Sequence, residues 1–72
     1  MNIIDTILKV LADNKSHRVK ELMEAANLTQ KKMERILDFL ARYGFIRYNK
    51  HREEVKITED TKRWLEFVNE ES

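Results

Sequence analysis

The stretch LTQKKMERILDFLARYGFI, which spans residues 28–46, decides the fold of this chain. Its apolar side chains recur at the three- and four-residue spacing of one buried helix face, and they are Met33, Ile36, Leu37 and Leu40. Thr29 is a favoured N-cap residue at the start of the stretch, and Gly44 is the residue type that most often follows the end of a helix. The stretch therefore predicts a helix over about residues 29–43, with a strand beginning behind it.

The residues before this helix predict a second, shorter one joined to it by a tight turn. It is expected over about residues 20–26, and its inward side is formed by Val19, Leu22, Met23 and Ala26. Asn27 suits the left-handed conformation that ends a helix. Leu28 then precedes the N-cap and can pack on Met33 as a hydrophobic staple, which fixes the angle between the two helices. This arrangement is a helix-turn-helix.

A further helix is predicted near the N-terminus, over about residues 3–13. Its apolar residues follow the spacing of one buried face, and they are Ile3, Ile4, Ile7, Leu8 and Leu11. Asn2 is suited to cap its start, and Asn14 to adopt the left-handed conformation at its end. Residues 16–19 are short and extended enough to add a minor third strand to the ribbon that follows.

Behind Gly44 the apolar residues alternate as in a two-stranded ribbon, with Ile46 and Tyr48 sharing one side of the first strand and Val55 and Ile57 one side of the second. This pattern predicts strands over residues 45–49 and 54–57, with a tip formed by residues 50–53.

Thr58 is expected to cap a last helix, whose apolar residues are Trp64, Leu65, Phe67 and Val68. The fold class is therefore mostly α (α+β): a single winged helix-turn-helix domain over residues 1–72. It has three helices, a two-stranded β-hairpin wing with a minor third strand, and a C-terminal helix.

The composition is that of a small globular domain. Hydrophobic residues make up 42% of the 72 residues, and no apolar run approaches the ~20 residues of a membrane span. Cysteine is absent, so disulfides and thiolate metal sites are excluded. We expect a cytoplasmic, nucleoid-associated protein with no membrane partner.

Charge is segregated along the chain although the net charge is only +1. Residues 1–28 hold four basic and four acidic side chains, which balance. Residues 29–57 hold eight basic and four acidic side chains, a net charge of +4. Residues 58–72 hold two basic and five acidic side chains, a net charge of −3. Positive charge thus gathers on the third helix and the ribbon, as in a nucleic-acid-binding surface.

The basic side chains of the third helix lie opposite its buried face and predict contacts to double-stranded DNA. The N-terminal residues of a recognition helix usually reach base edges, so Gln30, Lys31 and Arg35 are the candidates for base contacts. Lys32 and Thr29 are better placed for phosphate, at the positive end of the helix dipole. The full set of predicted DNA-binding residues is Thr29, Gln30, Lys31, Lys32, Arg35, Arg42, Arg47, Lys50, His51 and Arg52.

A solvated helix face is the alternative interpretation of the same residues. Glu34 and Asp38 also lie on this face, and each is positioned to pair with a basic residue one turn away. His51 is expected to be a polar residue at the tip of the wing, and His17 a surface turn residue.

Catalysis and metal binding are not expected. Ser16 and His17 are neighbours in sequence, which gives no reason for a nucleophile–base hydrogen bond, and no third orienting group is evident. Two isolated histidines without cysteine make no metal set, and no glycine-rich phosphate loop is present. We therefore expect a protein that is not an enzyme and that has no cofactor, no metal and no small-molecule ligand.

The chain resembles the small archaeal winged-helix regulators of the ArnR-like type. The matching positions are Ala26-Asn27-Leu28-Thr29, then Leu37, Leu40, Gly44, Phe45 and Ile46, and finally Thr58 and Leu65. The resemblance implies a DNA-binding regulator. The chain departs from the pattern at Arg35-Ile36, where relatives often have an aromatic residue, and at Thr61, where they have glycine. Many relatives also extend the last helix into a dimerising coiled coil; here a last helix of about four turns is expected, so that mode of dimerisation is not expected.

Two hypotheses follow. The first is a transcription regulator that reads the major groove with residues 29–43 and the backbone or minor groove with residues 47–56. It would act as a homodimer through Phe39, Trp64 and Phe67, unless Trp64 and Phe67 simply cover the first helix. The second is a winged-helix protein–protein interaction module of a transcription or replication assembly, in which the aromatic residues are the functional surface.

Overall fold

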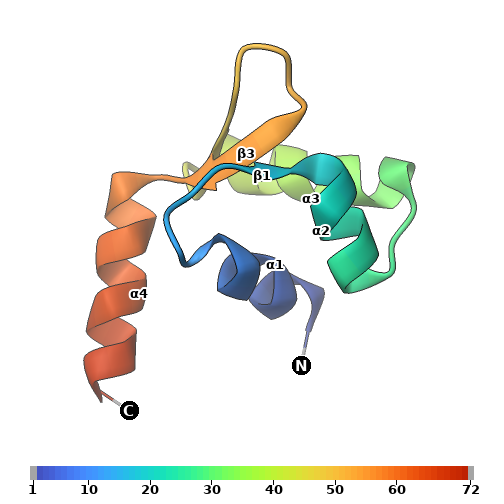
Figure 1. The fold of residues 1–72 in the computed structure, drawn as a ribbon. Helices are drawn as coiled ribbons and strands as arrows, with labels where there is room; N and C mark the ends of the chain where they lie inside the picture. The colour runs from blue at the N-terminus through green and yellow to red at the C-terminus, as the bar shows by residue number, and fades with distance from the viewer. Residues whose placement is uncertain (1, 72) are drawn as a thin grey trace.

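The computed structural model describes the backbone of residues 2–71 and the side chains of residues 2–68. The elements are α1 (Ile3–Leu11), β1 (His17–Arg18), α2 (Val19–Ala26), α3 (Gln30–Arg42), β2 (Ile46–Tyr48), β3 (Glu54–Ile57) and α4 (Glu59–Glu71). The strands form an antiparallel sheet in the order β1-β3-β2. Figure 1 shows the β2–β3 hairpin projecting from one side of the helices, with α4 running away from the sheet on the opposite side. The predicted winged helix-turn-helix order is confirmed, including the minor third strand.

Both helices of the helix-turn-helix end in the same way. At the end of α3 the Phe45 amide donates to the Leu40 carbonyl at 2.8 Å, and the Gly44 amide to that of Ala41 at 3.1 Å. These two bonds define a Schellman ending. The Leu28 and Asn27 amides make the equivalent bonds at the end of α2. Gly44 has φ +81° and Asn27 φ +55°, so both predicted left-handed terminators are confirmed.

Side-chain oxygens cap three helix starts as predicted. The Asp5 amide donates to Asn2 Oδ1 at 2.8 Å and the Lys32 amide to Thr29 Oγ1 at 3.4 Å. Thr58 has two roles at the start of α4. Its Oγ1 accepts the Thr61 amide at 3.3 Å, and its hydroxyl lies 2.7 Å from the Gly44 carbonyl. Because Gly44 follows the end of α3, this hydroxyl ties α3 to α4.

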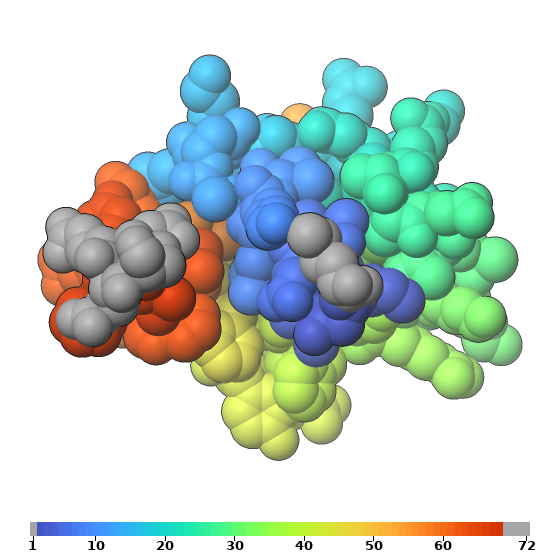
Figure 2. Space-filling view, turned by 90° about the horizontal axis from the view of Figure 1, so that it is seen from below, coloured from blue at the N-terminus to red at the C-terminus, as the bar shows by residue number. Residues whose placement is uncertain are grey.

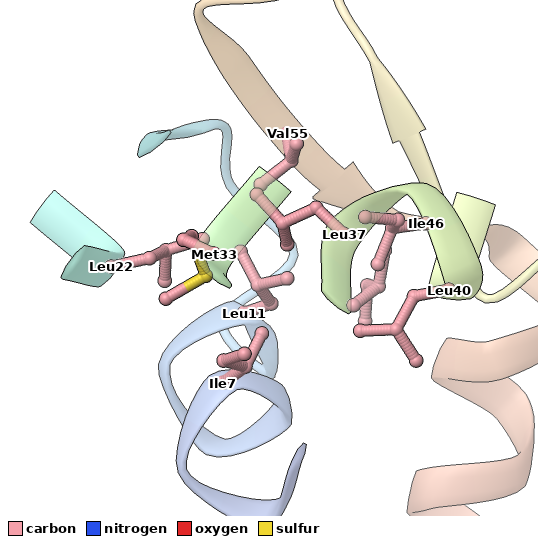
Figure 3. Close-up of a cluster of buried hydrophobic side chains, with 9 residues drawn as sticks. Ile7, Leu11, Leu22, Met33, Leu37, Leu40, Ile46 and Val55 are labelled. Carbon is pink, nitrogen blue, oxygen red and sulfur yellow. The ribbon is translucent and has the colours of Figure 1, made fainter. Parts of the chain in front are cut away.

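The core lies between α1, α2, α3 and the inner side of the sheet (Figure 3). Its buried apolar residues are Ile7, Leu11, Leu22, Met33, Leu37, Leu40, Ile46, Val55 and Ile57. Ile46 pairs with Ile57 and Tyr48 with Val55, so the predicted apolar side of each strand faces inward. Leu28 packs against this core, which contains Met33, as the staple requires.

The N-terminal end of α1 departs from the prediction. Ile3 and Ile4 keep 39% and 38% of their surface exposed, and α1 ends at Leu11 rather than Asp13. A helix stripe is buried only as far as another element covers it. The α2, α3 and sheet residues reach Ile7 and Leu11 but leave the first turn of α1 open.

The last helix stands apart from the rest of the molecule. Of its predicted apolar residues, Leu65 packs against the core. Trp64, Phe67 and Val68 remain 55%, 60% and 40% exposed, so most of the surface of Trp64 and Phe67 is open to solvent. Figure 2 shows α4 in orange beside α1 in blue, with the C-terminal part of α3 in yellow-green below them. No described helix is long and apolar enough to cross a membrane.

Candidate nucleic-acid interface

The outward side of α3 carries the basic residues that the sequence assigns to DNA. Met33, Leu37 and Leu40 are buried on the inner side. Helical geometry at 3.6 residues per turn places Lys31, Arg35 and Arg42 on the opposite side of the helix. Every residue of the predicted DNA-binding set is exposed: Thr29, Gln30, Lys31, Lys32, Arg35, Arg42, Arg47, Lys50, His51 and Arg52.

The cations at the start of α3 are uncommitted, whereas its glutamine is held. Lys31, Lys32 and Arg35 form no ion pair with another described residue. Gln30 Nε2 donates to Glu34 Oε1 at 3.1 Å, so its amide must exchange this bond for one to a base. The three cations therefore present their full charge to the solvent.

The tip of the wing is an ordered turn built on Asn49, which the sequence analysis did not single out. Asn49 Oδ1 accepts the amides of Glu53 at 2.9 Å and Glu54 at 3.1 Å. The Arg52 amide donates to the Asn49 carbonyl at 3.1 Å, and Arg52 has φ +58°. Asparagine often stabilises a turn by accepting hydrogen bonds from backbone amides further along the chain. An asparagine directly after the first strand of the hairpin was therefore the sequence signal that could have predicted this turn.

Asp38 joins the wing to α3. Its Oδ1 accepts from Arg52 Nη2 and from the Tyr48 hydroxyl, each at 2.8 Å. The Arg52 guanidinium also lies 4.2 Å from the centre of the Tyr48 ring. The expectation that Asp38 pairs one turn away is therefore wrong, because the hairpin brings Arg52 closer. Burial, followed by the hydrogen bond to Asp38, raises the pKa of Tyr48 to about 12.

The outer side of the hairpin holds a basic pair that sequence reasoning missed. Arg47 lies directly opposite Lys56 in the β2–β3 register, and both are exposed. Like charges facing each other across strands repel, and an anion between them relieves the repulsion. The predicted DNA-binding set contains Arg47 but not Lys56, although each of the two lies between the inward-facing apolar residues of its strand and therefore faces outward.

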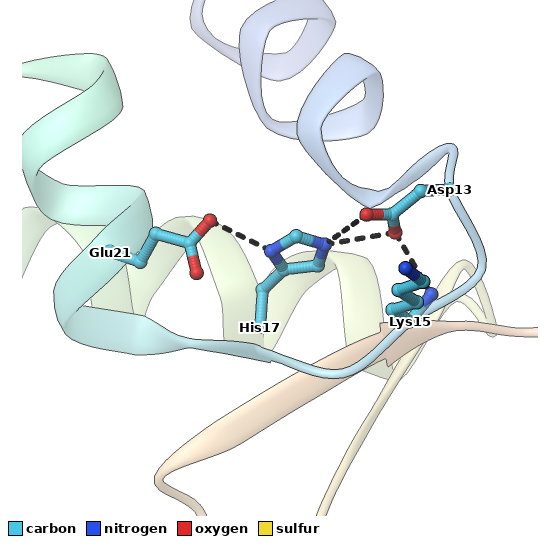
Figure 4. A network of polar contacts seen from close by, with 4 residues as sticks. All are labelled: Asp13, Lys15, His17 and Glu21. Carbon is cyan, nitrogen blue, oxygen red and sulfur yellow. Dashed lines mark hydrogen bonds and ion pairs between the residues drawn. The ribbon is translucent and has the colours of Figure 1, made fainter.

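A second polar cluster lies at the β1 edge of the sheet, on the other side of β3 from β2 (Figure 4). His17 Nδ1 lies 2.8 Å from Glu21 Oε2, and its Nε2 lies 2.9 Å from both carboxylate oxygens of Asp13. The prediction that His17 is a surface turn residue is wrong, since it lies in β1 with its side chain 13% exposed. The hydrogen bond to Asp13, with a smaller contribution from Glu21, raises the pKa of His17. The bond to His17 lowers the pKa of Asp13.

This His17 cluster ties the end of α1 to the start of α2. Its two carboxylates approach opposite ring nitrogens, so they cannot converge on one metal ion. Among the described side chains of residues 2–68, no group of three or more histidine, cysteine, aspartate or glutamate residues is arranged to hold a metal. The cluster is structural in this fold and lies apart from α3 and the wing tip.

Comparisons with known proteins agree with this architecture. The model of the family described as winged helix-turn-helix matches residues 1–71. A MarR family transcriptional regulator from Silicibacter pomeroyi DSS-3 has a similar structure, with a TM-score of 0.79 at 22% sequence identity. The match covers 99% of this chain and 54% of that regulator, so the chain spans about half the regulator's length. At this identity the likeness is one of fold. No curated protein matches the sequence.

Proposed function

Since the chain belongs to the winged helix-turn-helix family, we propose that it is a DNA-binding protein that acts as a transcription regulator. In this proposal α3 enters the major groove and the wing lies on the adjacent backbone or minor groove. The observation that carries the proposal is the outward side of α3, where Lys31, Lys32 and Arg35 are exposed and form no ion pair with another described residue.

The residues of α3 have different roles in the proposed complex. Lys31 and Arg35 are suited to guanine, and Gln30 to adenine once it leaves Glu34. Thr29 and Lys32 lie at the start of the helix, where the backbone dipole and a cationic side chain both favour phosphate. Arg42 lies two turns beyond Arg35 and would reach the backbone on the far side of the groove.

The wing adds a second basic region in this proposal. Arg47, Lys50 and His51 are exposed and would contact the phosphates beside the groove. Lys56 joins them because it faces Arg47 across the hairpin. Arg52 differs from these residues, since Asp38 already neutralises its charge.

We also propose a homodimer formed through α4. Trp64 and Phe67 are more than half exposed, and Phe39 at 49% lies 4.9 Å from the exposed Tyr43 ring. Exposed aromatic side chains in such number are typical of a contact surface. The same observation favours the second candidate function, a protein–protein interaction module of a transcription or replication assembly.

The motifs in residues 26–46 and 58–65 support a finer proposal, membership of the ArnR-like group of regulators. Asn27 and Gly44, two of the shared positions, terminate α2 and α3. A DNA partner would place the protein on the nucleoid in the cytoplasm.

The deciding experiment is a titration of duplex DNA at several salt concentrations. A protomer that touches about five phosphates should show a log–log slope of affinity against salt near −4 to −5. The double variant K31A/R35A should bind weakly with a flatter slope. K9A, which changes an exposed side chain on α1, should alter neither the affinity nor the slope. Absence of binding at low salt would refute the regulator and favour the interaction module.

A further inference from the structure

The side-chain cluster of Asp38, Tyr48 and Arg52 connects two parts of the molecule that are distant in sequence. Asp38 lies on α3, Tyr48 ends β2, and Arg52 lies in the turn between the strands. Both Arg52 and Tyr48 donate to the same Asp38 oxygen, and the guanidinium stacks on the Tyr48 ring. A charge-assisted bond, a phenol bond and a cation–π contact thus converge on one point.

These contacts decide where the wing tip lies relative to α3. Most other polar contacts of the tip are internal, because Asn49 bonds to the backbone of Arg52, Glu53 and Glu54. One further bond joins the tip to the start of α2, where the Val19 amide donates to the Glu53 carbonyl at 2.9 Å. Among the described residues, the two bonds to Asp38 are the hydrogen bonds that join β2, β3 and their turn to α3. The tip is therefore a preformed turn with one attachment to the start of α2, through the Glu53 backbone, and one to α3, through Asp38.

We infer that Asp38 is a positioning residue for DNA recognition, which acts through Arg52 by fixing the wing beside α3 and masking the Arg52 charge. The inference rests on the proposed function and deepens it. A wing held in one place contributes to binding only when the duplex fits α3 and the wing together, which favours one DNA sequence over others. A wing that is already ordered in the free protein also loses less conformational entropy on binding. The masked charge meanwhile reduces attraction to any duplex, since that attraction follows the number of phosphates neutralised.

The Asp38–Arg52 ion pair adds little to the stability of the fold, so its loss should affect the position of the wing and not folding. Arg52 and Asp38 keep 65% and 52% of their side-chain surface exposed, and exposed ion pairs add little to the stability of a fold. A short turn that is ordered by its own bonds and already joined to the start of α2 through Glu53 needs little free energy to be fixed beside α3. Tyr48 keeps its proton at neutral pH and so donates to Asp38 throughout the range in which binding is measured. We expect Asp38 variants to remain folded.

The first test uses the free protein. Heteronuclear ¹⁵N NOE values for the amides of residues 50–53 should fall in D38A and in R52A, because either change releases the tip from α3. The matched control is E34A, which removes one negative charge from the same helix one turn earlier without touching Arg52, and it should leave these values unchanged. Unchanged tip order in D38A would overturn the inference.

The second test compares two duplexes at one salt concentration, one selected from a random pool with the wild-type protein and one of random sequence. D38A and R52A should each lower the ratio of selected to random affinity by about threefold to tenfold, and the double variant D38A/R52A by no more than either alone. D38A should also bind the random duplex more tightly than wild type. E34A removes the same charge and also frees Gln30 from Glu34, so it should bind both duplexes more tightly without lowering the ratio of selected to random affinity.

The inference and the proposed function fail in different ways. If D38A strengthened binding to both duplexes equally while R52A weakened both, Arg52 would be an ordinary phosphate contact and Asp38 would have no positioning role. If the wild-type protein bound neither duplex, the proposed function would be wrong, and the NOE comparison would still show whether Asp38 orders the wing.

Discussion

Arg35 and Arg52 are both exposed arginines of the candidate interface, yet their surroundings differ. Arg35 lies on the outward side of α3 and forms no ion pair with another described residue. Arg52 pairs with Asp38 and stacks on Tyr48. A free guanidinium can meet a guanine edge in two bonds, whereas a paired one must first leave its partner. The two residues should therefore respond differently to substitution.

Replacing Arg35 by alanine should weaken binding to the selected duplex by roughly 1–3 kcal/mol, because a bidentate base contact is lost. Binding to random DNA should fall less. The free energy of unfolding should change by no more than about 0.5 kcal/mol, since the side chain is exposed. Fluorescence anisotropy with both duplexes and a urea titration measure the three quantities. Equal losses on the two duplexes would assign Arg35 to phosphate.

The His17 cluster makes a prediction about pH. The pKa of His17 is raised above its ordinary 6.5 by Asp13 and Glu21. Its stabilising effect is therefore fully present below pH 6.5 and is lost as pH rises through the raised value. Asp13 acts in the opposite direction, and its contribution above pH 3.8 is lost as pH falls through its lowered pKa. Between these limits both groups favour the fold.

The variant H17Q should therefore lower Tm more at pH 5.5 than at pH 8.5, because only the protonated imidazole gains from both carboxylates. Thermal unfolding followed by circular dichroism across this range measures the difference. H51Q is the matched control, since it removes a wing-tip histidine that forms no ion pair with another described residue. A Tm difference for H17Q that did not vary with pH would contradict this account.

At the scale of elements, the caps and terminators determine where helices begin and end. Asn27 and Gly44 occupy left-handed conformations at equivalent places after α2 and α3. The terminator after α2 leads into the turn before α3, and the one after α3 turns the chain into β2. These two residues therefore set the direction of the recognition helix and of the wing.

Substituting Gly44 should reveal the conformational part of this effect. A Cβ added at Gly44 would meet no atom within 4 Å, so the new methyl group of G44A causes no steric clash. It should still cost about 1–2 kcal/mol, because φ +81° is unfavourable for residues other than glycine. G44N should cost less, since asparagine tolerates this region, as Asn27 does. Urea denaturation of the three proteins measures the order, and equal losses for both variants would contradict it.

The fold was predictable from sequence because its signals are local. Strand parity, the helix spacing of α2 and α3, and the residues at Asn2, Asn27, Thr29, Gly44 and Thr58 each act within a few positions, and all were confirmed. The Asp38–Arg52 contact was not predictable, because it depends on the angle at which the hairpin folds beside α3. The exposure of Ile3 was not predictable either, because it depends on whether another element covers the first turn of α1. The roles of the DNA-binding set stay predictions.

At the scale of the whole molecule, charge and apolar surface are separated. Residues 29–57, with a net charge of +4, include α3 and the wing, and residues 58–72, with −3, include α4. The exposed aromatics Trp64 and Phe67 lie on the acidic helix. A domain of this size buries a limited core, and covering these aromatics in a symmetric dimer would add apolar burial.

Two copies of α4 brought together by a two-fold axis would place like charges near each other. Salt screens such repulsion and also weakens attraction to phosphates. Rising salt should therefore strengthen the dimer while it weakens DNA binding. Sedimentation velocity and duplex titration over the same salt series measure the two trends. Dissociation of the dimer by salt would show that its interface is held by ion pairs rather than by the aromatic side chains.

The variant W64A/F67A tests the dimer and its effect on DNA binding together. Both side chains are more than half exposed, so the variant should fold, and it should sediment as a monomer. Its log–log slope of affinity against salt should be about half that of the wild type, because one protomer neutralises half as many phosphates. R63A changes an exposed side chain on the same helix and should leave the dimer intact. A monomeric wild-type protein, or a variant with an unchanged slope, would mean that each protomer binds DNA alone and that the α4 aromatics serve another partner.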